Sequence, residues 1–92
     1  MIRSFRCPET RAIFERIGSK KFRAIEDAAY SRLERLNAAA RLADLSAIRG
    51  NRLEALKGGR KGQYSIRIND RYRLCFAWGP NGPENVEIVD YH

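Results

Sequence analysis

The chain has 92 residues, of which 43% are hydrophobic and 32% are charged. This length suits one domain that spans residues 1–92 and has a small core, and it excludes a repeat array or a large buried cofactor cavity. The apolar content excludes a disordered chain. The net charge is +7, and residues 49–73 alone carry eight basic and two acidic side chains, which is typical of a nucleic-acid contact but is equally compatible with a basic surface that has no partner.

The first half of the chain predicts a short strand followed by two helices. Ile2–Phe5 is a short segment with an apolar residue at each end, and we expect a strand there. Pro8 and Glu9 are suited to the first turn of a helix, and Gly18 ends that helix. A second helix begins near Phe22, because its apolar residues recur every three or four positions and form a stripe that packs in the core. The stripe consists of Phe22, Ile25, Ala29, Leu33, Leu36 and Ala40.

The second half predicts strands joined by turns. Residues 49–51 form a turn, and Lys57–Gly62 is a basic loop rich in glycine, for which a plain strand connection is the simplest interpretation. The predicted strands are Leu53–Leu56, Gln63–Asn69, Tyr72–Trp78 and Val86–Tyr91. Helices followed by consecutive antiparallel strands indicate an α+β domain in which the two N-terminal helices pack on one face of a small, mainly antiparallel sheet.

Alternation along the two central strands predicts what each face of the sheet carries. Ile66 and Ile68 share one side of the first strand, and Leu74 and Phe76 share one side of the second. These apolar residues should lie beneath the helices, because successive side chains of a strand point to opposite faces. Arg67 and Arg73 are then expected on the exposed face, beside the basic loop.

Several classes of site are absent from the sequence. It contains no phosphate-binding loop, dinucleotide fingerprint or nucleophile elbow. Cys7, Cys75 and a single histidine cannot supply a zinc site, so no metal or cofactor is expected. No signal peptide and no long apolar run are present, so we expect a cytoplasmic protein without a membrane segment, whose cysteines are reduced.

What remains is a group of basic residues together with the last three residues of the sequence. Cleavage of RNA by its own 2′-hydroxyl requires a group that takes the 2′ proton, cations for the charged phosphorane, and an acid for the leaving 5′ oxygen. The side chains available for these tasks are Lys57, Arg60, Lys61, Arg67, Arg73, Asp90, Tyr91 and His92. They favour a basic RNA-binding domain that could be a ribonuclease.

Each of these residues also has a simpler interpretation. His92 titrates near neutral pH, which suits proton transfer, but a terminal residue is commonly frayed and idle. Tyr91 could stack on a base or merely cover the end of the sheet. Asp90 could hold an arginine or the histidine in place. Arg67 and Arg73 could be solvent-facing charges that discourage edge-to-edge pairing of sheets.

Four segments resemble the HigB toxins of the RelE/ParE superfamily, with the greatest similarity to the GraT-like branch. They are Asn51–Gly58, Gly62–Asp70, Tyr72–Phe76 and Val86–His92. The N-terminal half is compatible with the same family, so the resemblance covers the whole chain. It implies a RelE-like fold and a type II toxin that enters the ribosomal A site and cleaves the mRNA there by general acid–base catalysis without metal.

The resemblance also implies roles for individual residues. Lys57 and Arg73 match positions that contact the scissile phosphate, and His92 matches a terminal histidine that transfers protons. Tyr91 matches a position that arranges the mRNA, and Asp90 a supporting one. Some relatives have histidine where this chain has Glu54; here the carboxylate either contacts RNA, acts as a weak base, or pairs with Arg52 or Arg73. We expect Arg60, Lys61 and Arg67 to bind RNA.

The implied partner is a HigA-type antitoxin with a helix-turn-helix domain, through which operator DNA is contacted. Two alternatives remain on the same fold: a gyrase-inhibiting toxin of the ParE type and a non-catalytic nucleic-acid or ribosome-binding module. Lys57, Arg73 and the Tyr91-His92 pair favour the nuclease, because a gyrase inhibitor does not need them together.

Overall fold

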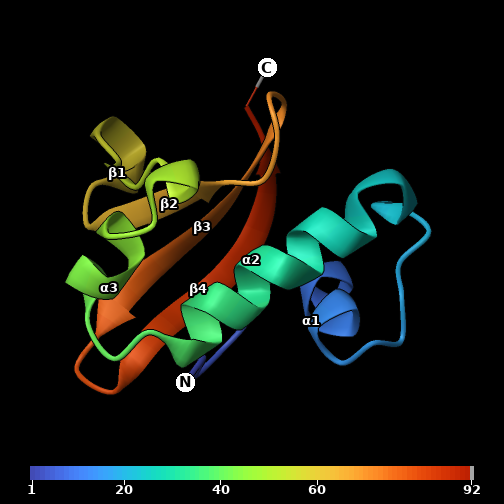
Figure 1. Cartoon of the computed structure of the whole chain (residues 1–92), viewed down its shortest axis with the longest axis horizontal. Helices are drawn as coiled ribbons and strands as arrows, with labels where there is room; N and C mark the ends of the chain where they lie inside the picture. Colours follow the sequence, from blue (N-terminus) through green and yellow to red (C-terminus); the bar gives the residue numbers. More distant parts are fainter. Residues whose placement is uncertain (92) are drawn as a thin grey trace.

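The computed structural model describes residues 1–91, and these form helices followed by a four-stranded sheet (Figure 1). The helices are α1 (Pro8–Phe14), α2 (Glu26–Ala38) and α3 (Leu42–Ser46). The strands are β1 (Glu54–Ala55), β2 (Gln63–Arg67), β3 (Tyr72–Gly79) and β4 (Gly82–Asp90). Short 3-10 turns occupy Arg23–Ile25 (η1), Arg49–Asn51 (η2) and Gly58–Arg60 (η3). Within the described part of the chain, no helix is long and apolar enough to cross a membrane.

The sheet has the strand order β1-β2-β3-β4, and all neighbouring strands are antiparallel. The predicted α+β architecture is therefore confirmed. β4 begins at Gly82, four residues before the predicted Val86, because Gly79 and Gly82 already pair across the β3–β4 turn. β1 is only two residues long and pairs with Tyr64 and Ser65, so the remainder of β2 is an edge of the sheet.

The N-terminal segment runs parallel to β4. Phe5 forms a bridge with Val86, and the Arg3 amide donates a hydrogen bond of 2.8 Å to the Pro83 carbonyl. The predicted strand Ile2–Phe5 is thus reduced to a single bridge, because the chain leaves the sheet at Pro8, the first residue of α1. The buried Thr10 hydroxyl accepts a hydrogen bond of 3.1 Å from the Ile88 amide, which fastens α1 to β4.

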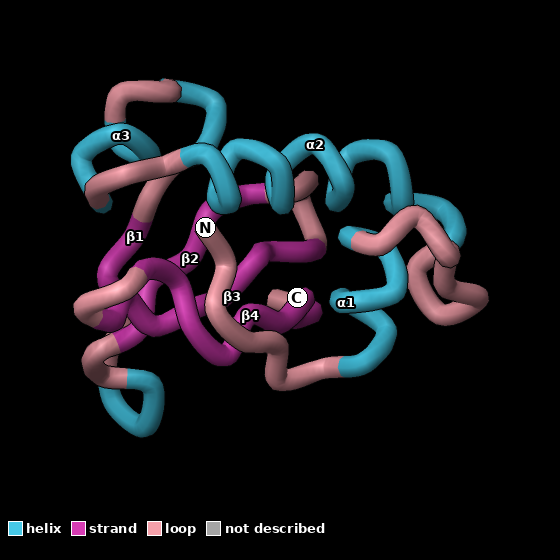
Figure 2. The backbone as a smooth tube through the Cα atoms, turned by 90° about the horizontal axis from the view of Figure 1, so that it is seen from below, coloured by secondary structure: helices cyan, strands magenta, loops and turns pink. Residues whose placement is uncertain are grey.

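α2 covers one face of the sheet (Figure 2) and contributes its apolar stripe to the core. Ala29, Leu33 and Leu36 are fully buried, as the periodicity predicts. The predicted ends were wrong: η1 precedes the helix, and Ala39 adopts an extended conformation that stops it. As a result Ala39 is buried in place of the expected Ala40.

α3 was not predicted from the sequence. It is held at its start by Asp44, whose carboxylate accepts hydrogen bonds of 3.0 Å and 2.9 Å from the amides of Arg41 and Ala40. These bonds lower the pKa of Asp44, because they stabilise its ionised form. The helix is too short to show a periodic pattern, and Leu45 is its one buried side chain.

Candidate active site

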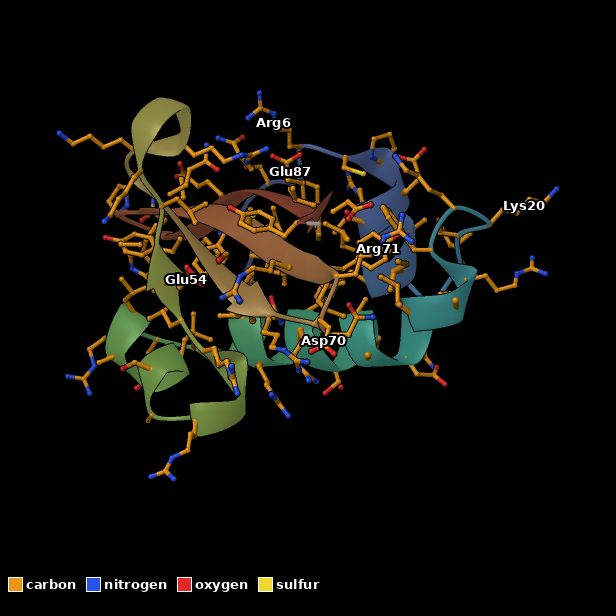
Figure 3. The ribbon with its side chains drawn as sticks, turned by 90° about the horizontal axis from the view of Figure 1, so that it is seen from above. Arg6, Lys20, Glu54, Asp70, Arg71 and Glu87 are labelled. Carbon is orange, nitrogen blue, oxygen red and sulfur yellow. The ribbon has the colours of Figure 1, made fainter. Side chains whose placement is uncertain are left out.

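The candidate site lies on the face of the sheet opposite α2, which we call the outer face. Ile66, Leu74 and Ile88 point into the core, so their neighbours along each strand point the other way. In register, Ser65 lies opposite Cys75, and Cys75 lies opposite Glu87. Figure 3 shows Glu87 and Arg6 on the side of the sheet away from α2.

Arg73 is buried in this face, with 9% of its surface exposed. Its Nε donates a hydrogen bond of 2.7 Å to the Ser65 hydroxyl, and its Nη2 donates to the backbone carbonyls of Ser65 and Arg52. The predicted exposure of Arg73 was therefore wrong. The small Ser65 side chain leaves room beside β3, and Arg52, whose φ is 45°, directs its carbonyl toward the guanidinium. These acceptors replace the water that an exposed arginine would bind.

Glu54 completes the surroundings of Arg73. One of its carboxylate oxygens lies 3.5 Å from Arg73 Nη1, and its side chain is 57% exposed. Of the interpretations open for this residue, the geometry favours an ion-pair partner of Arg73. Nε and Nη2 are occupied by neutral acceptors, whereas Nη1 lies beside the exposed Glu54 carboxylate.

A second ion pair lies across the outer face, between the basic loop and β4. Arg60 donates hydrogen bonds to Glu87 at 3.2 Å and to Gln63 at 3.1 Å, and Arg6 lies 3.8 Å from the same Glu87 oxygen. The hydrogen bond to Glu87 is the main cause that raises the pKa of Arg60. Glu87 was missed in the sequence, although its place between the core residues Val86 and Ile88 already assigned it to the outer face.

Tyr91 lies over the middle of this face. Its phenol forms a hydrogen bond with the thiol of Cys75, which is fully buried. Burial is the main cause that raises the pKa of both groups, and the positive charges of Arg60 and Arg73 oppose the rise. The Tyr91 phenol is therefore neutral at physiological pH, and the side chain remains 43% exposed.

The other predicted site residues are placed around this centre. Arg67 is half-buried and pairs with Asp70, and Asp90 pairs with Arg71, with 2.8 Å between the charged atoms. Lys57 and Lys61 are exposed in the loop that contains η3, and neither makes an ion pair within residues 1–91.

The structure thus brings together Arg73, Glu54, Arg60 and Tyr91, while Asp90 and Arg67 are each engaged by a neighbour of their own. The predicted catalytic role of His92 falls on a residue outside the described ones. Among the described residues, no group of three or more His, Cys, Asp or Glu is arranged to hold a metal ion. The outer face can hold an anionic strand between fixed guanidinium groups and an exposed aromatic ring.

Comparison with known proteins adds a family match. A family model described as the RelE-like toxin of the type II toxin-antitoxin system HigB matches residues 8–92. Toxin HigB-1 of Vibrio cholerae is 49% identical over 55 residues, which are 60% of this chain and 58% of that protein. The match therefore spans less than two thirds of the relative's length.

Solved structures show a similar fold at low sequence identity. The crystal structure of YafQ from E. coli has a TM-score of 0.64 at 9% identity and covers 99% of this chain and 92% of that one. The YoeB-YefM complex from Staphylococcus aureus has a TM-score of 0.58 at 19% identity and covers 100% of this chain and 98% of the matched one.

Proposed function

Because the chain belongs to the HigB family of RelE-like toxins of type II toxin–antitoxin systems, we propose that it is a ribosome-dependent endoribonuclease that cleaves mRNA in the ribosomal A site. Membership of this family implies an antitoxin partner. We further propose that this partner is a HigA-type helix-turn-helix protein, through which operator DNA is contacted, and that the toxin acts in the cytoplasm.

The observation that carries the proposal is the fixed guanidinium of Arg73. Three hydrogen bonds to neutral acceptors orient it, and Nη1 lies beside the exposed Glu54 carboxylate. During cleavage, negative charge develops on the phosphorane, and a cation that is oriented beforehand stabilises this charge without having to reorganise. Because Nη1 is the nitrogen that no neutral acceptor occupies, we assign it to the scissile phosphate.

The remaining groups take roles that the resemblance to the family implies. Lys57 is exposed and unpaired within residues 1–91, so its ammonium is available to a second phosphate oxygen. Tyr91 presents a neutral, partly exposed ring on which a base can stack. Asp90 is the last residue of β4 and is a supporting residue that forms an ion pair with Arg71. Arg60, Lys61 and Arg67 extend the basic surface toward the neighbouring phosphates.

The proposed reaction is attack of the 2′-hydroxyl on the adjacent phosphate. A bond forms between O2′ and phosphorus, the bond to O5′ breaks, and a cyclic 2′,3′-phosphate and a 5′-hydroxyl result. The 2′ proton passes to a base and the leaving oxygen receives a proton from an acid. We assign His92 to proton transfer. Glu54 forms an ion pair with Arg73, so we assign it to positioning Arg73 rather than to proton transfer.

The decisive experiment maps the ends of a defined mRNA on programmed ribosomes. The parent protein and His92→Gln are compared, with a ribosome-free sample as control. We expect cuts within the A-site codon that require the ribosome and are lost in His92→Gln. Free RNA should be cut weakly, because a shallow face aligns an in-line attack poorly without the ribosome.

Two results would contradict the proposal. Cleavage by His92→Gln at the parent rate would remove His92 from the mechanism. Absence of cleavage under all conditions, together with DNA damage that precedes the arrest of protein synthesis in cells, would favour a gyrase-inhibiting toxin. If neither cleavage nor toxicity occurs, a non-catalytic binding module is the remaining interpretation.

A further inference from the structure

Three arginines gather at the edge of β2 that the short β1 leaves uncovered. Arg32 of α2 donates a hydrogen bond of 2.9 Å to the backbone carbonyl of Arg67, which points away from β3. Arg35, almost one helical turn further along α2, donates a hydrogen bond of 2.9 Å to the side-chain oxygen of Asn51. The Arg67 side chain completes the group. We call Arg32, Arg35 and Arg67 the edge arginines.

The positive charge of the edge arginines exceeds the negative charge of the side chains that pair with them. Arg32 and Arg35 are anchored by neutral acceptors, and neither makes an ion pair within residues 1–91. Among residues 1–91, the only carboxylate paired with the group is that of Asp70, which is almost fully exposed and bound to Arg67. Burial lowers the pKa of Arg32, and the charges of Arg35 and Arg67 lower it further. Like charges held together in this way attract an anion.

The geometry of the group is suited to phosphate. Each guanidinium is a planar fork that binds phosphate oxygens in pairs. Arg32 uses Nε and Arg35 uses one Nη1 hydrogen for its anchor, so most of their N–H donors remain for a ligand. All three side chains are half-buried, which means that they are already ordered before a ligand arrives.

The position of the group connects it to the outer face. Arg67 pairs in register with Arg73 on the neighbouring strand, so the edge arginines continue the basic surface from Arg73 over the edge of the sheet onto α2. The apolar side chains that are most exposed, Met1, Ile17, Ile48 and Tyr91, are not part of the group. Protein interfaces have an apolar centre, whereas nucleic-acid interfaces are polar and positively charged; the surface therefore fits a nucleic acid.

We propose that the edge arginines bind the sugar–phosphate backbone of the RNA next to the phosphate that lies at Arg73. The proposal rests on the proposed function, because it extends the RNA-binding surface of that site to Arg32 and Arg35. These two residues position the strand and do not take part in bond breaking. Their loss should weaken binding and raise KM while kcat stays close to that of the parent.

A binding experiment that does not depend on cleavage tests this surface. The probe is a short fluorescent single-stranded RNA in which every 2′-hydroxyl is methylated, so that it cannot be cut. Its dissociation constant is measured by anisotropy at several KCl concentrations. For Arg32→Gln/Arg35→Gln we expect affinity to fall at least about tenfold at low salt, and the slope of log affinity against log salt to decrease by about 1.4, because two phosphate contacts are lost.

Two matched double variants serve as controls. Lys20→Gln/Arg23→Gln removes the same charge from exposed positions that precede α2, where Figure 3 shows Lys20 far from Glu54. Its affinity should change less than about threefold and its slope should be unchanged. Arg32→Lys/Arg35→Lys retains the charge and should recover most of the affinity. Circular dichroism and the melting temperature confirm that each variant is folded.

The outcomes separate this inference from the proposed function. Equal losses in the two glutamine variants would show a general charge effect and overturn the inference. Normal RNA binding by Arg32→Gln/Arg35→Gln with loss of the antitoxin complex would assign the surface to the antitoxin and overturn it as well. If RNA binding falls as expected while the ribosome assay shows no cleavage, RNA binding by the edge arginines is supported and the nuclease proposal is contradicted.

Discussion

At the scale of single residues, Arg73 combines burial with charge in a way that a lysine cannot reproduce. Its guanidinium donates three hydrogen bonds through Nε and Nη2, and its third nitrogen, Nη1, lies beside the Glu54 carboxylate. A lysine ammonium has the same charge but ends in one atom, so it cannot reach Ser65, the Arg52 carbonyl and Glu54 together. The site thus depends on the shape of the side chain as well as on its charge.

We therefore predict that Arg73→Lys abolishes growth inhibition and lowers the free energy of unfolding by about 1–3 kcal/mol, since buried hydrogen-bond partners are left unsatisfied. Urea unfolding and toxin expression in cells measure the two effects. Arg71→Lys is the matched control, because Arg71 is exposed and pairs with a single carboxylate; it should be nearly as stable as the parent and remain toxic. If Arg73→Lys remained toxic, the planar shape of the guanidinium would not be required for toxicity.

At the scale of secondary-structure elements, the hairpin of β3 and β4 also holds the N-terminal segment. Gly82 lies at the start of β4 with a φ of 126°, and a Cβ atom at this position would lie 2.6 Å from the Met1 carbonyl oxygen. A side chain there would meet both a strained backbone and a clash with the segment that pairs with β4.

We predict that Gly82→Ala lowers the free energy of unfolding by about 1–3 kcal/mol. Gly59→Ala is the control, because Gly59 has no atom within 4 Å of its Cβ position and lacks a positive φ; its stability should change by less than about 0.5 kcal/mol. Denaturant unfolding measures both. Equal effects of the two substitutions would mean that the contact between Gly82 and Met1 does not contribute to stability.

The elements also show how far the sequence predicts the site. Alternation along the two central strands identified the core side chains Ile66, Ile68, Leu74 and Phe76, because every second side chain of each strand points toward the core. It did not predict that Arg73 is buried, since the cover comes from Arg52 and Glu54, whose position depends on the turn before β1. Arg32 and Arg35 were missed for the same reason: helical spacing identifies the buried stripe of α2, but only the short length of β1 leaves an edge that Arg32 can reach.

At the scale of the whole molecule, the chain has a net charge of +7, and each of the seven ion pairs among the described residues has at least one exposed partner. Exposed pairs contribute little to stability, whereas repulsion between like charges acts across the entire surface. The family and its fold followed from the sequence, but the balance between attraction and repulsion depends on which charges the fold brings together.

We predict that moderate salt stabilises the protein. Raising NaCl should increase Tm by about 2–5 °C, because screening weakens the repulsion among the arginines more than it weakens exposed ion pairs. Differential scanning calorimetry at constant pH measures this shift, and an uncharged osmolyte at matched osmolality is the control for preferential exclusion. A lower Tm in salt would show that the ion pairs dominate.

The pairing of the N-terminal segment with β4 has a consequence for biosynthesis. Asn85 binds Ser4 at the surface and Ile88 binds Thr10 in the core, so contacts between β4 and the N-terminal part of the chain join residues 81 and 78 positions apart. Contacts between such distant parts of a chain form late and slowly. A growing polypeptide that lacks β4 has neither the partner of its first residues nor Glu87 and Tyr91 of the outer face. The outer face is therefore assembled only after β4 has been synthesised and has left the ribosomal exit tunnel.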